Sequence, residues 1–262
     1  MFGALVAVIG AVARTRLRET PDFADARRRI KNAIIETNSN TDILNKNVMW
    51  NEKVNKKTAL SLFFIECSWP VCFYFAYMYC GNILTNTFHF SPEQVIHQNF
   101  IVSMIQLVSW IVLAYLSYKI YPLKIIKVRL AIFLVFIFIC PYLLNNITSP
   151  YQLMIMQSII VVFGFMGTPA IPIFYKHFPV FKRFTYATFS YALSRAFIYV
   201  VTSFGLVYFS KFFNNWVVLV VMLPTAATFI YAIYHFEFLE RTREQPLYQV
   251  EKTHQDLDLP SH

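Results

Sequence analysis

The sequence is poor in glycine and in charged residues. Only 6 of its 262 residues are glycine, and only 14% are Asp, Glu, Lys or Arg, whereas soluble domains carry about a quarter charged residues. The low charge argues against an ordinary soluble domain. The hydrophobic residues, 57% of the chain, fall in blocks of the length that crosses a bilayer as a helix, about 20 residues. We therefore expect an all-α integral membrane protein.

The sequence has few cysteines and none of the patterns that carry common chemistry. Cys67, Cys72, Cys80 and Cys140 lie within or at the ends of apolar blocks without metal-ligand spacing, and we interpret them as packing residues. No nucleophile–base arrangement, phosphate-binding glycine loop or His/Cys metal site stands out. We therefore predict no catalytic residues, no metal site and no cofactor, and we do not expect an enzyme.

Acidic residues are outnumbered, 14 against 23 Lys and Arg, which gives a formal net charge of +9. On a soluble protein such a charge would suggest nucleic acid as a partner. Here the basic residues sit beside apolar blocks, which is typical of anchoring to anionic lipid and of setting membrane topology. We expect the lipid bilayer, and no nucleic acid, as a partner.

The order of polar and apolar segments predicts four regions. Residues 1–18 form a short apolar run followed by Arg, which we interpret as a membrane helix that lacks its beginning; residues 19–57 form a polar cytoplasmic linker, with an amphipathic helix near residues 23–35. Residues 58–238 hold six spans. The expected spans are 58–82, 95–118, 122–144, 150–175, 186–209 and 216–238. Residues 239–262 form a cytoplasmic tail, expected to be disordered after Glu240.

Lys and Arg alternate from one predicted loop to the next. The linker, the loop near Lys119, the loop near Lys182 and the tail are basic, while residues 83–94 and 145–149 contain no Lys or Arg. Basic short loops stay on the cytoplasmic side, so the linker and the C-terminus are predicted to be cytoplasmic. The third span is the least secure, because Lys124, Lys127 and Arg129 lie near its start; such long side chains can snorkel toward water.

Three segments carry a resemblance to a known family. Residues 18–23 read Arg-Glu-Thr-Pro-Asp-Phe, residues 178–185 read Phe-Pro-Val-Phe-Lys-Arg-Phe-Thr, and residues 113–120 read Leu-Ala-Tyr-Leu-Ser-Tyr-Lys-Ile. The first resembles the start of the central loop, the second the loop between helices ten and eleven, and the third the repeated loop motif of the major facilitator superfamily, in its metabolite:proton symporter branch. The whole chain resembles a truncated sixth helix, the central loop and the six-helix C-terminal bundle of such a transporter.

The resemblance implies transport, with one alternative. A proline/betaine transporter-like protein of the bacterial inner membrane would take up a small zwitterionic solute with a proton by alternating access, here together with a separately encoded N-terminal half. The alternative is a truncated, non-transporting remnant. Departures from the family pattern favour the remnant: Tyr118 stands where the loop motif has Asp, Lys176-His177 stand before Phe178 where the branch often has an acid, and glycines are scarce.

Glu66 and Arg195 are ionisable residues within predicted spans, where such groups are costly and point to function. They lie at similar depths, so an ion pair between them would lower the cost of burying both. In the functional interpretation Glu66 is a proton-coupling carboxylate in a central cavity. In the other, the two form a structural pair, or Arg195 snorkels to the surface.

Two further groups could line a solute path. Gly164, Gly167 and Pro169 interrupt the fourth span, and an interrupted helix can expose backbone groups to a substrate; the alternative is a simple kink. Trp69, Tyr74 and Tyr77 cluster on the first span. Aromatic faces attract quaternary ammonium groups, but tyrosines near a membrane surface are also ordinary interface anchors.

Overall fold

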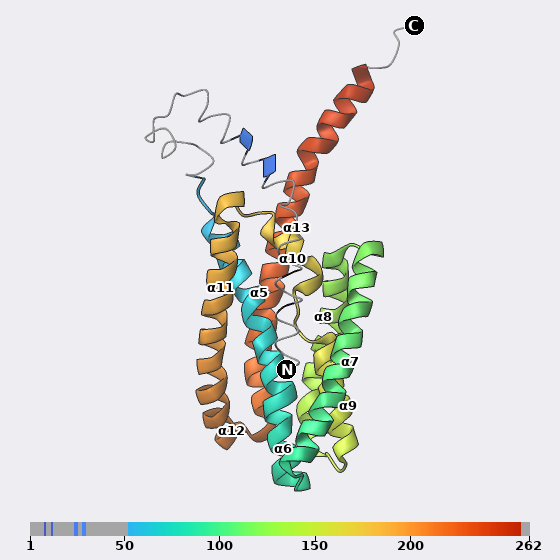
Figure 1. Cartoon of the computed structure of the whole chain (residues 1–262), viewed down its shortest axis with the longest axis vertical. Helices are drawn as coiled ribbons and strands as arrows, with labels where there is room; N and C mark the ends of the chain where they lie inside the picture. The colour runs from blue at the N-terminus through green and yellow to red at the C-terminus, as the bar shows by residue number, and fades with distance from the viewer. Residues whose placement is uncertain (1–7, 9–11, 13–23, 26–27, 30–51, 258–262) are drawn as a thin grey trace. The chain divides into compact units, whose positions relative to one another are not determined.

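The computed structural model describes residues 8, 12, 24–25, 28–29 and 52–257, and these residues form helices and connecting loops without strands (Figure 1). The chain divides into two compact units, Met1–Lys53 with Phe178–Phe184, and Val54–His177 with Thr185–His262. The second holds nearly all described residues. The prediction of an all-helical chain is confirmed for them, while most of the predicted partial helix and linker, including the motif at residues 18–23, lie outside them.

A helix covers most of each predicted span. The helices in chain order are α5 (Lys56–Phe73), η1 (Tyr74–Tyr79), α6 (Cys80–Phe88), α7 (Pro92–Lys119), α8 (Pro122–Asn145), α9 (Pro150–Phe163), η2 (Thr168–Ala170), α10 (Ile171–Tyr175), α11 (Val180–Val200), η3 (Val201–Leu206), α12 (Val207–Phe213), η4 (Asn214–Trp216) and α13 (Val217–Leu257). In the described part of the chain, four helical stretches are long and apolar enough to cross a membrane: Lys56–Phe88, Pro92–Lys119, Pro150–Tyr175 and Lys211–Thr242.

Two of these stretches begin with the same local signal. Ser91 and Ser149 each precede a proline at the first helical turn and form a capping box with the glutamine three residues later. The serine side chain and the glutamine side chain satisfy each other's free backbone N–H groups, and proline needs no donor at that position. This signal explains why α7 and α9 can start directly after short turns.

Aromatic side chains fill the space between helices where many membrane proteins use small residues. α5 and α13 lie side by side in the middle, with α11 on one side and α7, α8 and α9 on the other (Figure 1). Phe165 packs between Phe133 of α8 and Phe229 of α13, with ring centroids 4.9 and 5.5 Å apart, and all three rings are buried. The scarcity of glycine is therefore matched by a phenylalanine core.

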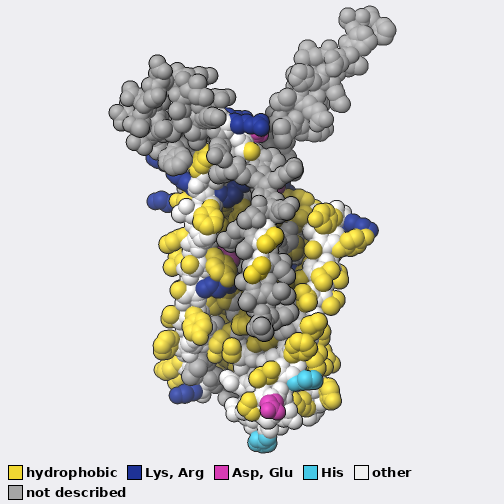
Figure 2. All heavy atoms as spheres, viewed as in Figure 1, with side chains coloured by type: hydrophobic (Ala, Val, Ile, Leu, Met, Phe, Trp, Pro, Cys, Tyr) yellow, Lys and Arg dark blue, Asp and Glu magenta, His cyan; other side chains and the backbone are white. Residues whose placement is uncertain are grey.

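α7 contributes little to this core. Only Gln98 and Val102 of its 28 residues are buried, and apolar side chains such as Phe100, Leu107 and Ile111 are exposed. Hydrophobic side chains likewise cover the long sides of the helices in Figure 2. An apolar surface of this kind suits lipid or another apolar helix, because neither offers hydrogen bonds to polar groups.

Charged side chains gather around Glu237 and Glu240, in the middle of α13. Glu240 is only 4% exposed and forms an ion pair with Lys176 and a contact of 2.6 Å with His177 Nε2. Lys127 pairs with Glu237 at 2.5 Å rather than extending to water. The prediction of a disordered tail after Glu240 is wrong as far as Leu257, because α13 continues to that residue.

Candidate functional site

An open pocket of about 420 Å³ lies between α5–η1 and α11–η3. Its walls are mainly aromatic, with one cation and two aliphatic hydroxyl groups. The lining residues are Trp69, Pro70, Phe73, Tyr74, Met78, Tyr191, Arg195, Ile198, Tyr199, Thr202 and Ser203. A volume of this size lies within the range of small-molecule sites. All of these residues belong to the second compact unit.

Two π-helices border the pocket. η1 supplies Tyr74 and Met78, and η3 supplies Thr202 and Ser203. A π-helix bonds each N–H to the carbonyl five residues back, and short π-helical turns inside α-helices occur frequently at functional sites. Each of the two facing helices is thus irregular where it lines the pocket.

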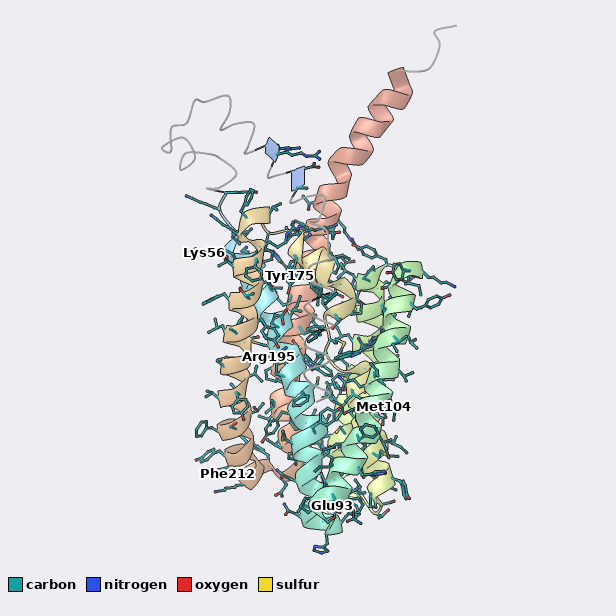
Figure 3. The ribbon with its side chains drawn as sticks, viewed as in Figure 1. Lys56, Glu93, Met104, Tyr175, Arg195 and Phe212 are labelled. Atoms are coloured by element: carbon teal, nitrogen blue, oxygen red, sulfur yellow. The ribbon has the colours of Figure 1, made fainter. Side chains whose placement is uncertain are left out.

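Pro70 explains how Arg195 is held there. Proline has no N–H, so the carbonyl four residues earlier in α5, that of Glu66, loses its intrahelical donor. Arg195 replaces that donor, with its Nη1 donating to Glu66 O at 3.2 Å. Its guanidinium also lies over the Tyr191 ring, 4.5 Å from the centroid. Figure 3 shows Arg195 about midway along the continuous stretch of α11, η3 and α12.

Glu66 and Arg195 therefore meet, but through the Glu66 main chain. Among the described residues no ion pair joins their side chains. The Glu66 carboxyl instead lies near the Tyr175 hydroxyl, at the end of α10. The predicted contact thus takes a different form, and Glu66 lies beside the pocket rather than in its lining.

Of the three predicted aromatic residues, two line the pocket. Trp69 and Tyr74 do so, whereas the Tyr77 hydroxyl donates to Gln106 Oε1 of α7 at 2.8 Å and lies 3.2 Å from Ser103 Oγ. Tyr77 serves the contact with α7.

Gly164, Gly167 and Pro169 lie outside the pocket, at the break between α9 and α10. A Cβ atom on Gly167 would approach Ile65 Cγ2 to 2.6 Å, and one on Gly164 would approach Cys72 Sγ to 3.1 Å. Both glycines therefore allow the broken segment to pack closely on α5. Pro169 is in η2, the short turn that follows.

Arg129 was expected near a membrane edge but is buried at this break. It is 7% exposed, and its Nη2 and Nε donate to Val162 O at 2.5 and 3.1 Å, with Gly164 O 3.5 Å from Nη2. The last carbonyls of a helix lack intrahelical donors and carry partial negative charge. Arg129 thus caps the end of α9 instead of snorkelling to water.

A third donor side chain, that of Gln157, acts on η1. Because the Cys80 N–H bonds to Phe75 O, the Ala76 carbonyl loses the donor that an α-helix would give it. Gln157 of α9 supplies one, from Nε2 at 2.6 Å, and its Oε1 accepts from Gln98 at 2.8 Å. Gln157 is fully buried, so these bonds join η1, α7 and α9 in an apolar interior.

The sequence contained an unused signal for the second wall of the pocket. Tyr191, Arg195, Ile198, Tyr199 and Thr202 are spaced three or four residues apart, which places them on one face of a helix. That face presents a guanidinium between tyrosine rings. Chemically it can hold a carboxylate on Arg195 and an organic cation against aromatic faces.

Comparisons with protein-family models, with curated proteins and with solved structures find no match for this chain. A function is therefore inferred from its residues and their arrangement. In that arrangement, the aromatic pocket around Arg195 has room for a small molecule and presents a guanidinium beside aromatic rings.

Proposed function

We propose that this chain is the C-terminal half of a secondary active transporter of the major facilitator superfamily. In this proposal it takes up a small zwitterionic solute such as proline or betaine with a proton, across a bacterial inner membrane. The observation that carries the proposal is the pocket in which Arg195 lies among aromatic side chains. The resemblance of three sequence segments to the symporter branch supplies the solute class and the proton.

A six-span bundle with a cytoplasmic C-terminus accompanies this proposal. In it, α8 and the α11–α12 stretch cross the membrane in addition to the four long apolar stretches. The basic start of α8 is compatible with such a span, because Lys127 pairs with Glu237 and Arg129 bonds to backbone carbonyls. Charges in a membrane are tolerated when they face the bundle interior and are paired.

The solute would lie with its carboxylate on Arg195 and its cationic group against Trp69 and Tyr74. A guanidinium and a carboxylate form charge-assisted bonds, which are about twice as strong as neutral ones. Trp and Tyr faces attract cations through their quadrupoles. An N-terminal half of the transporter would close the open side of the pocket and permit alternating access.

Arg195→Gln is expected to weaken binding of glycine betaine to the purified chain in lipid nanodiscs by about 10- to 100-fold. This is the expected effect of losing one hydrogen bond between the solute carboxylate and a charged group. Isothermal titration of the wild type and the variant measures this. Tyr77→Phe is the matched control, because that side chain points to α7. Equal affinity of the Arg195→Gln chain and the wild type would refute the assigned carboxylate site.

Glu66→Gln is expected to leave solute binding within about twofold and to abolish proton-driven uptake, since an amide cannot release a proton. The assay is uptake into proteoliposomes that hold the chain with an N-terminal half, with and without an imposed pH gradient. Glu237→Gln, in the middle of α13 and outside the pocket, is the control. Uptake by the Glu66→Gln chain that still follows the gradient would remove Glu66 from the coupling step.

The alternative, a remnant without transport, is favoured by the nearly unburied α7 and by the departures at Tyr118 and Lys176. It expects the wild-type chain to bind neither proline nor betaine. It also expects no uptake when an N-terminal half is present. These results would separate the two functions without any variant.

A further inference from the structure

Four sulfur-bearing side chains from four helices line one small cavity in the core of the second unit. They are Cys80 of α6, Cys140 of α8, Met156 of α9 and Met222 of α13. All four are at most 4% exposed. The sequence showed no pattern here, because the four positions lie in four separate apolar blocks.

The cavity has room for a single atom. Its volume is about 10 Å³, close to the space of one water-sized sphere. The remaining walls are hydrocarbon or aromatic, apart from the Tyr79 hydroxyl, which donates to Asn215 Oδ1 at 2.6 Å. The two thiols and two thioethers are therefore the groups of this cavity that are available to a ligand.

We propose that Cys80, Cys140, Met156 and Met222 bind one monovalent copper ion, Cu(I). Thiolate and thioether sulfur are soft ligands that select Cu(I), whereas Mg²⁺ and Ca²⁺ require oxygen. Among the described residues no three His, Cys, Asp or Glu side chains gather, so this set differs from the usual zinc sites, which hold three or four of them.

Charge balance in the apolar cavity favours a monovalent ion. An isolated charge in such surroundings is very costly. When Cu(I) binds, one thiol of Cys80 or Cys140 loses its proton to solvent and a copper–sulfur bond forms, which leaves the site neutral. The copper stays in its monovalent state, so the step needs no oxidant or reductant. A divalent ion bound to one thiolate would leave a net positive charge.

The test is an anaerobic titration of the purified full chain, in detergent, with Cu(I) in competition with bicinchoninate. We expect one equivalent to bind. Cys80→Ser with Cys140→Ser should weaken binding at least 100-fold, and Met156→Leu with Met222→Leu about 10-fold, because hydroxyl and hydrocarbon groups replace soft ligands. The controls are Cys67→Ser, a buried thiol outside the cavity, and Met104→Leu, an exposed thioether on α7.

X-ray absorption at the copper edge gives a second, independent readout. It should show a shell of sulfur neighbours only, and nitrogen or oxygen neighbours would overturn the assignment. In the titration, the assignment fails if the wild-type chain binds no copper. It also fails if the double cysteine variant binds copper as tightly as the wild type does. Thermal unfolding without copper shows whether each variant folds; if the double cysteine variant does not, the methionine pair and Cys140→Ser alone decide.

The proposal of a copper site and the proposal of a transport function can be tested independently of each other. Arg195 does not line the sulfur cavity, so Arg195→Gln should bind Cu(I) as tightly as the wild type does. A chain that binds copper but no zwitterion would support the metal site and the remnant hypothesis together.

Discussion

Gly164→Ala is expected to lower the free energy of unfolding by about 3 kcal/mol, the upper end of the usual cost of overpacking. The added Cβ would lie 2.3 Å from Ile160 O and 3.1 Å from Cys72 Sγ. The backbone cannot move aside easily, because Ile160 O also accepts the Gly164 N–H at 2.8 Å. Chemical unfolding of the detergent-solubilised chain, followed by tryptophan fluorescence, measures the difference.

Gly81→Ala is the matched control for this experiment. Its Cβ would meet only Val95 Cγ1, at an ordinary distance of 3.7 Å, and alanine favours a helix over glycine by about 1 kcal/mol. We expect its stability to equal or exceed that of the wild type. A Gly164→Ala chain as stable as Gly81→Ala would show that the break between α9 and α10 yields without cost.

The positions of the helices could be predicted from the sequence for a simple physical reason. A membrane helix must satisfy its backbone internally and its length is set by the bilayer, so long apolar blocks with short loops leave few alternatives. Arg195 was also visible, as a charge inside an apolar block. The continuation of α13 past Glu240 was not predicted, because that segment is polar and has no apolar periodicity. Near its start, Glu237 pairs with Arg241 one turn later, at 3.0 Å.

The sequence shows which polar groups need a partner, but it does not show which residue is that partner. Pro70, four residues after Glu66, indicates from sequence alone that the Glu66 carbonyl needs another donor. The sequence cannot show that Arg195, 129 residues later, is that donor. Arg129 was misplaced for the same reason: local sequence puts it in a basic helix start, while its acceptor Val162 comes from another helix.

At three interruptions of the helices, a side-chain donor bonds to a backbone carbonyl that has lost its intrahelical partner. Arg195 bonds to the carbonyl freed by Pro70, Gln157 to the Ala76 carbonyl freed by the π-helix, and Arg129 to the carbonyls at the end of α9. An unsatisfied carbonyl costs several kcal/mol in an apolar interior. Each irregular backbone segment is thus paired with one long donor side chain, which in the case of Arg195 also lines the pocket.

Arg129→Leu is expected to loosen the break between α9 and α10 more than it lowers global stability. Two opposing effects follow from the change. Val162 O loses bonds from a charged donor, worth about 1.5–3 kcal/mol each. The costly burial of a charge is relieved at the same time, and replacing a buried charge with an apolar group can be close to neutral overall.

The measurement must therefore be local. Hydrogen exchange in the peptide that covers Gly164 should become about 100-fold faster in the Arg129→Leu chain, because loss of two such bonds corresponds to roughly two factors of ten. Arg129→Lys should restore part of the protection, since an ammonium group supplies a donor without the planar fork. Lys124→Leu, an exposed cation on the same helix, should exchange as the wild type does. Unchanged exchange in Arg129→Leu would mean that the packing of Phe165 against Phe133 holds the break without the guanidinium.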